Sequence, residues 1–447
     1  MKAGKQRKLS SWQFITLGYL LIILVGSFLL TLPIASRSGT WTPLPDALFT
    51  ATSATCVTGL VVVDTYLHWS LFGQLVVITL IQIGGVGFMT VLTMVMMLLQ
   101  KNVGLYQRQV IMQAAGNLSL SGSVRLIRRI LKGTLLIEGL GALLFSFRFC
   151  RDFGLWEGLY YSIFHAISAF CNAGFDLMGR FGPFSSLTPY ADDPLITLTA
   201  AALVLIGGLG FLVWTDLLRY KHHWSRYSLH TRIALTASLF LVAIPTVLFY
   251  CYEQNGLLAG LSGPQALLRA FFAAVSPRTA GFNTIDMGAM TTGSYLLTAV
   301  LMMIGGNSGS TAGGIKITTF VVAIFSPITA ARRSRSMVIG GKALDESVQK
   351  EAMSTLVAYL ILTVCGCLIL AGFEPFSLTE ILLEVISAVA TVGLTTGITS
   401  SLSSVSQLTL ILLMFAGRVG VMTLAVAFGD RRNPPPLRRP TDRILIG

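Results

Sequence analysis

Four short strings recur along the chain at a nearly even pitch of roughly 110 residues. Each begins with serine and ends with glycine: Ser53-Ala54-Thr55-Cys56-Val57-Thr58-Gly59, Ser168-Ala169-Phe170-Cys171-Asn172-Ala173-Gly174, Ser276-Pro277-Arg278-Thr279-Ala280-Gly281 and Ser387-Ala388-Val389-Ala390-Thr391-Val392-Gly393. The chemistry they offer is that of the peptide carbonyl, because rings of carbonyl oxygens can replace the hydration shell of an alkali cation. The repeat therefore predicts one chain folded four times around a pore.

The ion ligands are expected at the end of each string, where glycine permits left-handed backbone and close approach. The predicted ion-binding residues are Val57, Thr58, Gly59, Asn172, Ala173, Gly174, Thr279, Ala280, Gly281, Thr391, Val392 and Gly393. A single glycine of this kind more often marks a tight turn or a helix-packing contact. Four glycines in equivalent positions favour a selectivity filter.

The elements that position these strings must lie in a membrane. The chain has 447 residues, of which 53% are hydrophobic and 11% charged. A bilayer core needs about 20 helical residues per crossing. Uncharged stretches of at least that length occupy 9–36, 65–100, 194–215, 233–252 and 352–373. These stretches predict a polytopic α-helical membrane protein. The first could be taken for a signal peptide, but it is long and no small-residue cleavage site follows it, so it is read as a retained span.

The net charge of +13 is concentrated beside the ends of these stretches, in clusters at 2–8, 101–132, 219–232, 332–350 and 431–443. This placement indicates cytoplasmic loops rather than a nucleic-acid interface. The chain must therefore cross the membrane an even number of times between clusters, although each interval holds three apolar segments. The shortest, middle segments (45–54, 156–170, 264–276 and 375–389) are predicted to dip into the membrane from outside and return.

The predicted fold is an all-α polytopic membrane protein with four pseudo-repeats of span, pore helix and span around one central pore. The repeats cover 9–100, 124–219, 231–332 and 350–430, and a short basic cytoplasmic tail covers 431–447. The C-terminal ends of the pore helices carry partial negative charge, which favours a cation on the axis. Acidic residues outnumber basic ones on the predicted outer half, Asp64 and Asp176 among them.

A gate is predicted in the last span of the third repeat, where residues rich in glycine, serine and threonine cannot hold a stable helix. The predicted gate residues are Gly305, Gly306, Asn307, Ser308, Gly309, Ser310, Thr311, Ala312, Gly313, Gly314, Lys316 and Arg418. Arg418 is included because it stands alone in a long uncharged stretch and should face the pore or the bundle interior. The alternative for Arg418 is a structural ion pair with Glu138. The glycine clusters at 84–87 and 207–210 are read as close-packing sites.

Two other classes of protein are less compatible with the sequence. A secondary transporter with inverted repeats would place its basic loops on alternating sides, whereas each repeat here starts and ends on one side. An enzyme or a receptor would need a reactive cluster, and His165, His222, His223 and His230 have no acidic metal cluster beside them. No bound cofactor or enzymatic activity is expected, and the six cysteines are read as unpaired thiols.

The strings resemble the filter sequences of the Trk/Ktr/HKT potassium-transporter superfamily, and the resemblance extends over about 14–428. Segment 305–319 is similar to the intramembrane gating loop of that family, and Arg418 falls where the family has an arginine in its last span. The sequences Ala47-Leu48-Phe49-Thr50-Ala51 and Gln82-Ile83-Gly84-Gly85 are most similar to bacterial KtrB subunits. Cys56 and Cys171 depart from the small residues common at these filter positions.

The resemblance implies a potassium-uptake subunit in a bacterial plasma membrane, with both termini cytoplasmic and surrounded by membrane lipids. Potassium at the filter is the substrate and the only metal expected, and sodium is a possible activator. The family also implies a homodimer with one pore per protomer and a cytosolic, nucleotide-binding KtrA-like regulatory ring. Gly59 is the residue that goes with potassium rather than sodium preference. A Trk-type transporter, or a transporter of sodium or another cation, remains the alternative within this architecture.

Overall fold

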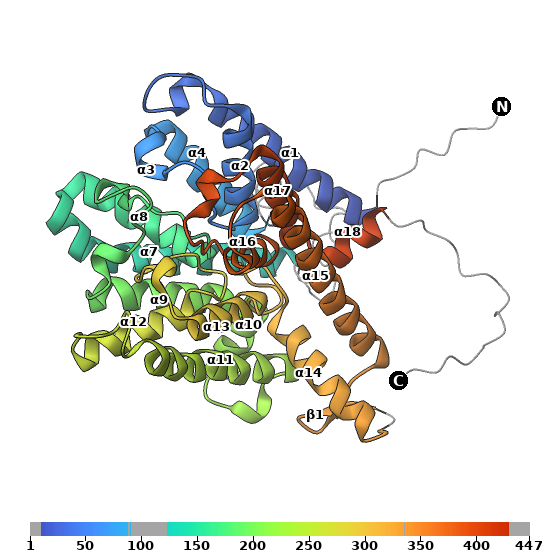
Figure 1. Cartoon of the computed structure of the whole chain (residues 1–447). Coiled ribbons are helices and arrows are strands. Elements are labelled where there is room, and N and C mark those ends of the chain that lie inside the picture. Colours follow the sequence, from blue (N-terminus) through green and yellow to red (C-terminus); the bar gives the residue numbers. More distant parts are fainter. Residues whose placement is uncertain (1–9, 88–89, 91–122, 335, 429–447) are drawn as a thin grey trace, which may run out of the picture.

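The computed structural model describes residues 10–87, 90, 123–334 and 336–428. The predicted tail at 431–447 and much of the basic cluster at 101–132 lie outside these residues. The described chain is almost entirely helical (Figure 1). Its strands are β1 (Val338–Ile339) and β2 (Lys342–Ala343), which form a small antiparallel hairpin that the all-helical prediction did not include.

Each predicted repeat opens with a long helix: α1 (Ser11–Thr31), α7 (Ser123–Phe153), α11 (Leu229–Glu253) and α15 (Glu346–Phe373). These are the helices in the described chain that are individually long and apolar enough to cross a membrane. Large apolar side chains on their outer faces are exposed: 65% of Phe28, 67% of Leu135 and 70% of Leu368 is accessible. Such faces suit contact with lipid rather than water. The structure is that of a multi-pass membrane protein.

A short helix follows each long one: α2 (Leu44–Cys56), α8 (Leu155–Cys171), α12 (Gly263–Val275) and α16 (Leu378–Ala390). With 13 to 17 residues, these four helices are too short to cross a bilayer. α16 begins at a capping box that Ser377 and Glu380 form. Pro375, the first residue of the predicted segment 375–389, lies outside the first turn because the helix is capped at Ser377.

The last span of each repeat is α4 (Leu71–Val86), α9 (Pro194–Leu209), α13 (Thr292–Met303) or α17 (Ser404–Val419). Within the described residues, a further helix continues α9, α13 and α17: α10 (Phe211–Tyr220), α14 (Ile317–Ala331) and α18 (Val421–Phe428), respectively. Segment 304–316 breaks the third repeat as predicted. The sequence analysis missed two other breaks: α9 and α10 meet at 94°, and α17 and α18 at 90°.

These missed breaks lie at Gly210 and Gly420, with φ of 89° and 92°. A left-handed glycine ends a helix without the steric penalty of a side chain. The predicted close packing is also present, because a Cβ on Gly207 would collide with the carbonyl oxygen of Phe170 at the end of α8. The glycine clusters therefore allow the pore helices to pack closely on the spans, and they also allow the spans to bend.

Short elements complete the fold on its periphery. They are α3 (Thr65–His68) and the 3-10 helices η1 (Pro33–Ala35), η2 (Met178–Arg180), η3 (Thr188–Tyr190), η4 (Trp224–Arg226), η5 (Met287–Ala289) and η6 (Ile398–Ser401). Most of them lie in the loops between a pore helix and the span that follows it.

The repeats are arranged as a closed ring. The last span of each repeat packs on the pore helix of the next: α4 on α8, α9 on α12, α13 on α16 and α17 on α2. The α17–α2 contact joins the fourth repeat to the first, and Figure 1 shows the red-brown end of the chain beside the blue start. The chain thus returns to its beginning around a common axis.

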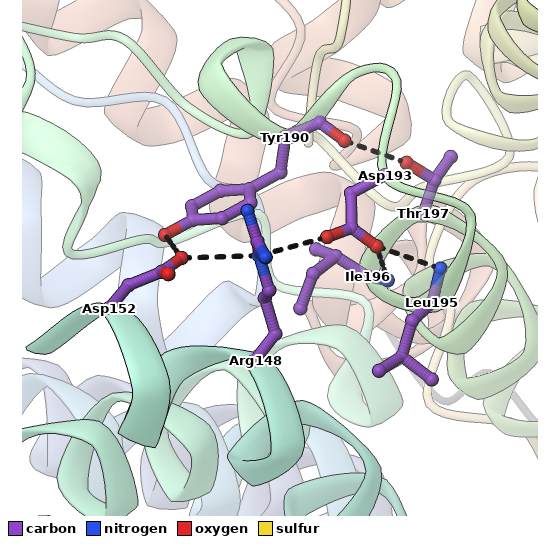
Figure 2. A network of polar contacts seen from close by, with 7 residues as sticks. All are labelled: Arg148, Asp152, Tyr190, Asp193, Leu195, Ile196 and Thr197. Atoms are coloured by element: carbon purple, nitrogen blue, oxygen red, sulfur yellow. Dashed lines mark hydrogen bonds and ion pairs between the residues drawn. The ribbon is translucent and has the colours of Figure 1, made fainter. Parts of the chain in front are cut away.

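A polar network ties α7 to α9 within the second repeat (Figure 2). The Arg148 Nε lies 3.2 Å from an Asp152 oxygen and 3.1 Å from an Asp193 oxygen. Tyr190 donates to Asp152 at 2.9 Å, and Asp193 also caps α9 by accepting from the Leu195 amide at 2.9 Å. One guanidinium therefore holds the end of the first span against the start of the last.

A second ion pair joins neighbouring repeats. Arg269 on α12 donates from Nε and Nη2 to the two carboxylate oxygens of Asp192, at 2.8 and 2.7 Å. These hydrogen bonds hold the pKa of Asp192, in the loop before α9, below its ordinary value. The pair links the third pore helix to the loop of the second repeat.

Candidate ion pathway

All four strings follow the same backbone path. The residue two positions before the glycine of each string is left-handed, although none of these residues is glycine: Val57 (φ 58°), Asn172 (φ 59°), Thr279 (φ 64°) and Thr391 (φ 52°). The glycine two positions later again has positive φ in each string. Non-glycine residues in this region are uncommon, and such strain is concentrated at functional sites. The shared path indicates one structural device used four times.

The serine that opens each string anchors it. The amides of Thr58, Ala173 and Val392 donate at 2.8 Å to the carbonyl oxygen of the serine five positions earlier. In the third string the amide of Ala280 reaches Ser276, only four positions earlier, at 3.0 Å. The shorter third string therefore keeps the same anchor despite its missing residue.

The serine hydroxyls add a second attachment. Those of Ser53 and Ser387 accept from the amides of Gly59 and Gly393, at 3.1 and 2.9 Å. Ser168 instead donates its hydroxyl to the carbonyl oxygen of Phe175 at 2.6 Å. Each serine thus fixes the backbone around its glycine from inside the fold.

The four glycines meet in sequence around a closed circuit. The atom nearest to a Cβ added on each glycine belongs in every case to the next repeat. A Cβ on Gly59 would lie 2.5 Å from the Ala173 carbonyl oxygen, one on Gly174 2.8 Å from the Gly281 Cα, and one on Gly281 2.6 Å from the Val392 carbonyl oxygen. A Cβ on Gly393 would collide with the Thr58 carbonyl oxygen of the first repeat. The backbones therefore approach one another as closely as side-chain-free residues allow. All twelve predicted filter residues lie in these converging strings.

A cavity of about 100 Å³ opens on one side of the glycine ring, and all four ring glycines line it. The carboxylates of Asp64 and Asp176, predicted for the outer surface, also face this cavity. Acidic groups around a narrow opening raise the local concentration of cations. This outer cavity therefore has the charge expected for a cation entrance.

Segment 304–316, the predicted gate, lies beneath the strings on the other side. The Asn307 amide donates to the Gly208 carbonyl oxygen at 2.9 Å, and the Thr311 hydroxyl donates to that of Phe170 at 3.1 Å. A Cβ on Gly313 would collide with the Thr391 side chain at the foot of the fourth string. The loop thus contacts the ends of the pore helices of the second and fourth repeats, which flank the third repeat in the ring.

Arg418 joins three repeats through backbone carbonyls. Its Nη1 donates to Thr311 in the loop at 2.5 Å, and its Nη2 donates to the carbonyl oxygen of Gly84 on α4. The alternative ion pair with Glu138 is not formed among the described residues, since Glu138 accepts from Gln82 at 3.2 Å instead. Arg418 therefore holds the loop of the third repeat against the first.

Lys316 is the other cation of the predicted gate. Its Nζ donates to the carbonyl oxygens of Ala312 and Gly313, at 2.6 and 3.5 Å. Lys316, Arg418, Gly309 and Gly314 all line an inner cavity of about 310 Å³. The candidate pathway therefore consists of an outer cavity, the glycine ring, a loop held by two cations, and an inner cavity.

Comparison with known proteins identifies the family of the chain. A family model described as TrkH, cation transport protein, matches residues 5–432. The chain belongs to the TrkH family.

Two curated relatives match nearly the full length of the chain. It is 38% identical to the potassium/sodium uptake protein NtpJ of Enterococcus hirae, over 100% of this chain and 99% of that protein. It is also 38% identical to the Ktr system potassium uptake protein B of Bacillus subtilis, over 97% of this chain and 96% of that protein. The crystal structure of the potassium transporter TrkH from Vibrio parahaemolyticus has the same fold, with a TM-score of 0.75, 19% identity, and coverage of 96% of this chain and 86% of that one.

His165 and Cys171, which the sequence analysis considered as reactive or unusual residues, both lie in the packed interior of this TrkH-family chain. His165 is buried in α8, where its Nδ1 lies 2.7 Å from the Tyr161 carbonyl oxygen and its Nε2 accepts from the Leu177 amide at 3.3 Å. Cys171 lies at the end of that helix, and all six cysteines are free. The reading of the cysteines as unpaired thiols is confirmed.

Glu384 is a buried acid behind the ring that the sequence analysis did not single out. Its side chain is fully buried in α16, and it accepts hydrogen bonds from the hydroxyls of Thr395 and Thr399. Both threonines line the outer cavity. The sequence feature that could have identified Glu384 is its position as a lone carboxylate, three residues before Ser387, in an otherwise apolar helix end.

Replacing Glu384 by leucine is expected to destabilise the protein. The hydroxyls of Thr395 and Thr399 would lose their acceptor, and a broken buried hydrogen bond of this type costs about 1–3 kcal/mol. Thermal unfolding of the purified protein in detergent measures the effect. Glu384→Gln, which keeps one acceptor oxygen, should lose less, and Thr379→Ala at an exposed site on the same helix should change little. Equal unfolding temperatures for Glu384→Leu and Thr379→Ala would contradict the role given to Glu384.

Proposed function

We propose that this TrkH-family chain takes up potassium across the bacterial plasma membrane. The observation that carries the proposal is the closed circuit of four glycine strings, in which each glycine crowds the next repeat. The relatives include potassium uptake proteins, which supports the same ion.

The proposed path begins at the outer cavity, where Asp64 and Asp176 gather cations. The ion then exchanges its water for the backbone carbonyls of the strings. The C-terminal ends of four pore helices contribute partial negative charge at this level. Potassium is the substrate held at this ring, and Gly59 favours it over sodium.

Passage toward the inner cavity is controlled by segment 304–316. In the described arrangement Arg418 and Lys316 hold the loop under the ring. A guanidinium beside a cation path also raises an electrostatic barrier. We therefore assign this arrangement to the closed state of the gate.

The proposed assembly is a homodimer with one pore per chain, controlled by a cytosolic nucleotide-binding ring. The basic clusters at 219–232 and 332–350 mark the cytoplasmic side, so both termini lie there. The basic cluster at 332–350 offers a docking face for an acidic regulatory partner. Sodium would act on this assembly as an activator, and no resident cofactor is needed for permeation.

Sodium transport by the same architecture is the second candidate. It is favoured by the name of one relative, a potassium/sodium uptake protein. Competition between the two ions in one uptake assay separates the candidates. Equal uptake of both ions would favour the second.

Expression of the full chain is expected to restore growth of a potassium-uptake-deficient bacterium on limiting potassium. The assay is run with and without a regulatory subunit, because the partner sets the open fraction. Gly281→Val, which fills the ring, serves as the inactive variant, and Gly182→Val in an outer loop serves as its control, since a Cβ there meets nothing within 4 Å. Growth with Gly281→Val, or its absence with the unaltered chain and partner, would refute the proposal.

A further inference from the structure

A large cavity lies outside the ion path, between the start of α7 and α10. Its volume is about 750 Å³, and its polar walls include Arg129, Lys132 and Arg219. Its apolar walls include Leu136 and Leu218. The combination of cations and open apolar surface is typical of a site for an amphiphile.

The cations have no carboxylate partner in the part of the chain that the structure describes. The one acid of the cavity wall, Asp216, already accepts from the hydroxyls of Ser228 and Thr231, at 2.7 and 2.6 Å. Arg219 lies instead over the Tyr220 ring, 5.2 Å from its centroid. The cavity therefore presents unneutralised positive charge to an anionic ligand.

The order of residues along α7 matches the order of groups in a phospholipid. Arg129, Lys132 and Leu136 are spaced three and four residues apart, so they follow one helix face. The two cations come first, near the predicted cytoplasmic end, and Leu136 lies a turn deeper with 65% of its side chain exposed. A phosphate can bind at the cations while an acyl chain runs along the leucine.

α10 completes the site as a helix at the membrane surface. It turns by 94° from α9, so it runs across that span rather than through the membrane. Leu218 is 80% exposed, Arg219 follows it, and Trp214 lies on the cavity wall. Tryptophan, arginine and an open leucine on one short helix are typical of the lipid interface.

The same helix is bonded to the gate. The amide of Phe211, the first residue of α10, donates to the carbonyl oxygen of Gly309 at 2.8 Å. Phe211 and Ile130 line both this cavity and the inner cavity of the ion path. A ligand that fixes α10 against α7 therefore also fixes one edge of the loop.

We propose that an acidic phospholipid of the inner leaflet binds between α7 and α10 and steadies the gating loop through Phe211. The phosphate lies among Arg129, Lys132 and Arg219, and an acyl chain covers Leu136 and Leu218. The binding step stands on this cavity alone, whereas the effect on flux rests on the proposed function.

The test compares two charge-matched triple variants of the full chain. One is Arg129→Gln/Lys132→Gln/Arg219→Gln, and its control is Arg128→Gln/Lys221→Gln/Arg226→Gln, which removes three exposed cations that do not line the cavity. Binding of phosphatidylglycerol to the purified, detergent-solubilised proteins is measured by native mass spectrometry. Each basic residue contributes about fivefold to binding of an acidic lipid, so affinity should fall on the order of 100-fold in the first variant only.

Equal loss in both variants would overturn the proposal, as would unchanged binding in the first. Competition by dissolved glycerol 3-phosphate as strong as by the lipid would assign the site to a free phosphate ester and overturn it too. Loss of dimer without loss of lipid would assign the surface to a protein contact. Unfolding temperature shows whether a variant is folded, and the three single variants replace the triple if it is not.

Potassium flux in vesicles gives the second readout. Replacing phosphatidylglycerol by phosphatidylcholine should change flux through the unaltered chain and the control. It should leave flux through the cavity variant unchanged. Absence of any flux would refute the proposed function while leaving the lipid measurement intact, and a cavity variant that still responds to lipid would overturn the link to the gate.

Discussion

Replacing Gly59 by serine is expected to lower the ratio of potassium to sodium uptake by about tenfold or more. Gly59 has φ of 92°, and its Cβ would lie 2.5 Å from the Ala173 carbonyl oxygen in the next string. A side chain in such backbone costs about 1–3 kcal/mol, which the fold can relieve only by moving that carbonyl or the strained peptide. A free-energy difference of about 1.4 kcal/mol corresponds to a factor of ten in relative binding. Strain of this size is therefore enough to lower the selectivity for potassium over sodium about tenfold.

The measurement is uptake of rubidium and of sodium by cells that express each variant at equal abundance in the membrane. Gly182→Ser provides the matched control, since its Cβ would contact nothing within 4 Å. Its ion ratio should equal that of the unaltered chain. An unchanged ratio in Gly59→Ser would show that this string does not select the ion.

The strings could be found from sequence because their geometry depends on local residue types. A short helix, an anchoring serine and a glycine recur together, and each has a residue signature that survives divergence between repeats. The third string shows how robust the signal is, because Ser276 keeps its bond to the string although one residue is missing. Strings of this kind predict convergence, and the structure brings them together.

The bends at Gly210 and Gly420 could not be predicted in the same way. Glycine clusters in an apolar helix are compatible with close packing and with a break, and the sequence analysis chose packing for the cluster at 207–210 and predicted no break at Gly420. Both occur here, and the choice depends on tertiary contacts. A Cβ on Gly210, for example, would lie 2.8 Å from the Ser308 carbonyl oxygen of the loop.

The hydrogen-bond partners of Arg418 could not be predicted from the sequence for a related reason. A lone arginine in a span suggests an acidic partner, and Glu138 was the available carboxylate. Its observed acceptors are instead the backbone carbonyls of Thr311 and Gly84, and every residue type supplies such an acceptor. Sequence can therefore indicate that a buried cation needs partners, but the fold decides which backbone is near.

Shortening the loop by deleting residues within 309–314 is expected to raise potassium flux by about tenfold. The deletion removes the contact between Thr311 and Arg418 and displaces Gly313 from beneath Thr391. A hydrogen bond from a charged donor contributes about 1.5–3 kcal/mol, so losing one shifts a closed loop toward open by a factor of ten or more. Flux is measured as initial rubidium uptake per transporter in vesicles.

Arg418→Gln separates the loop from its restraint without changing chain length. It removes the charge and weakens the bonds to Thr311 and Gly84, so it should also raise flux, whereas Arg226→Gln at an exposed site should not. Agreement between the deletion and Arg418→Gln would show that the restraint, rather than the bulk of the loop, limits passage. If both variants carry the same or less flux while remaining folded, the loop is a structural strut and the barrier lies elsewhere on the path.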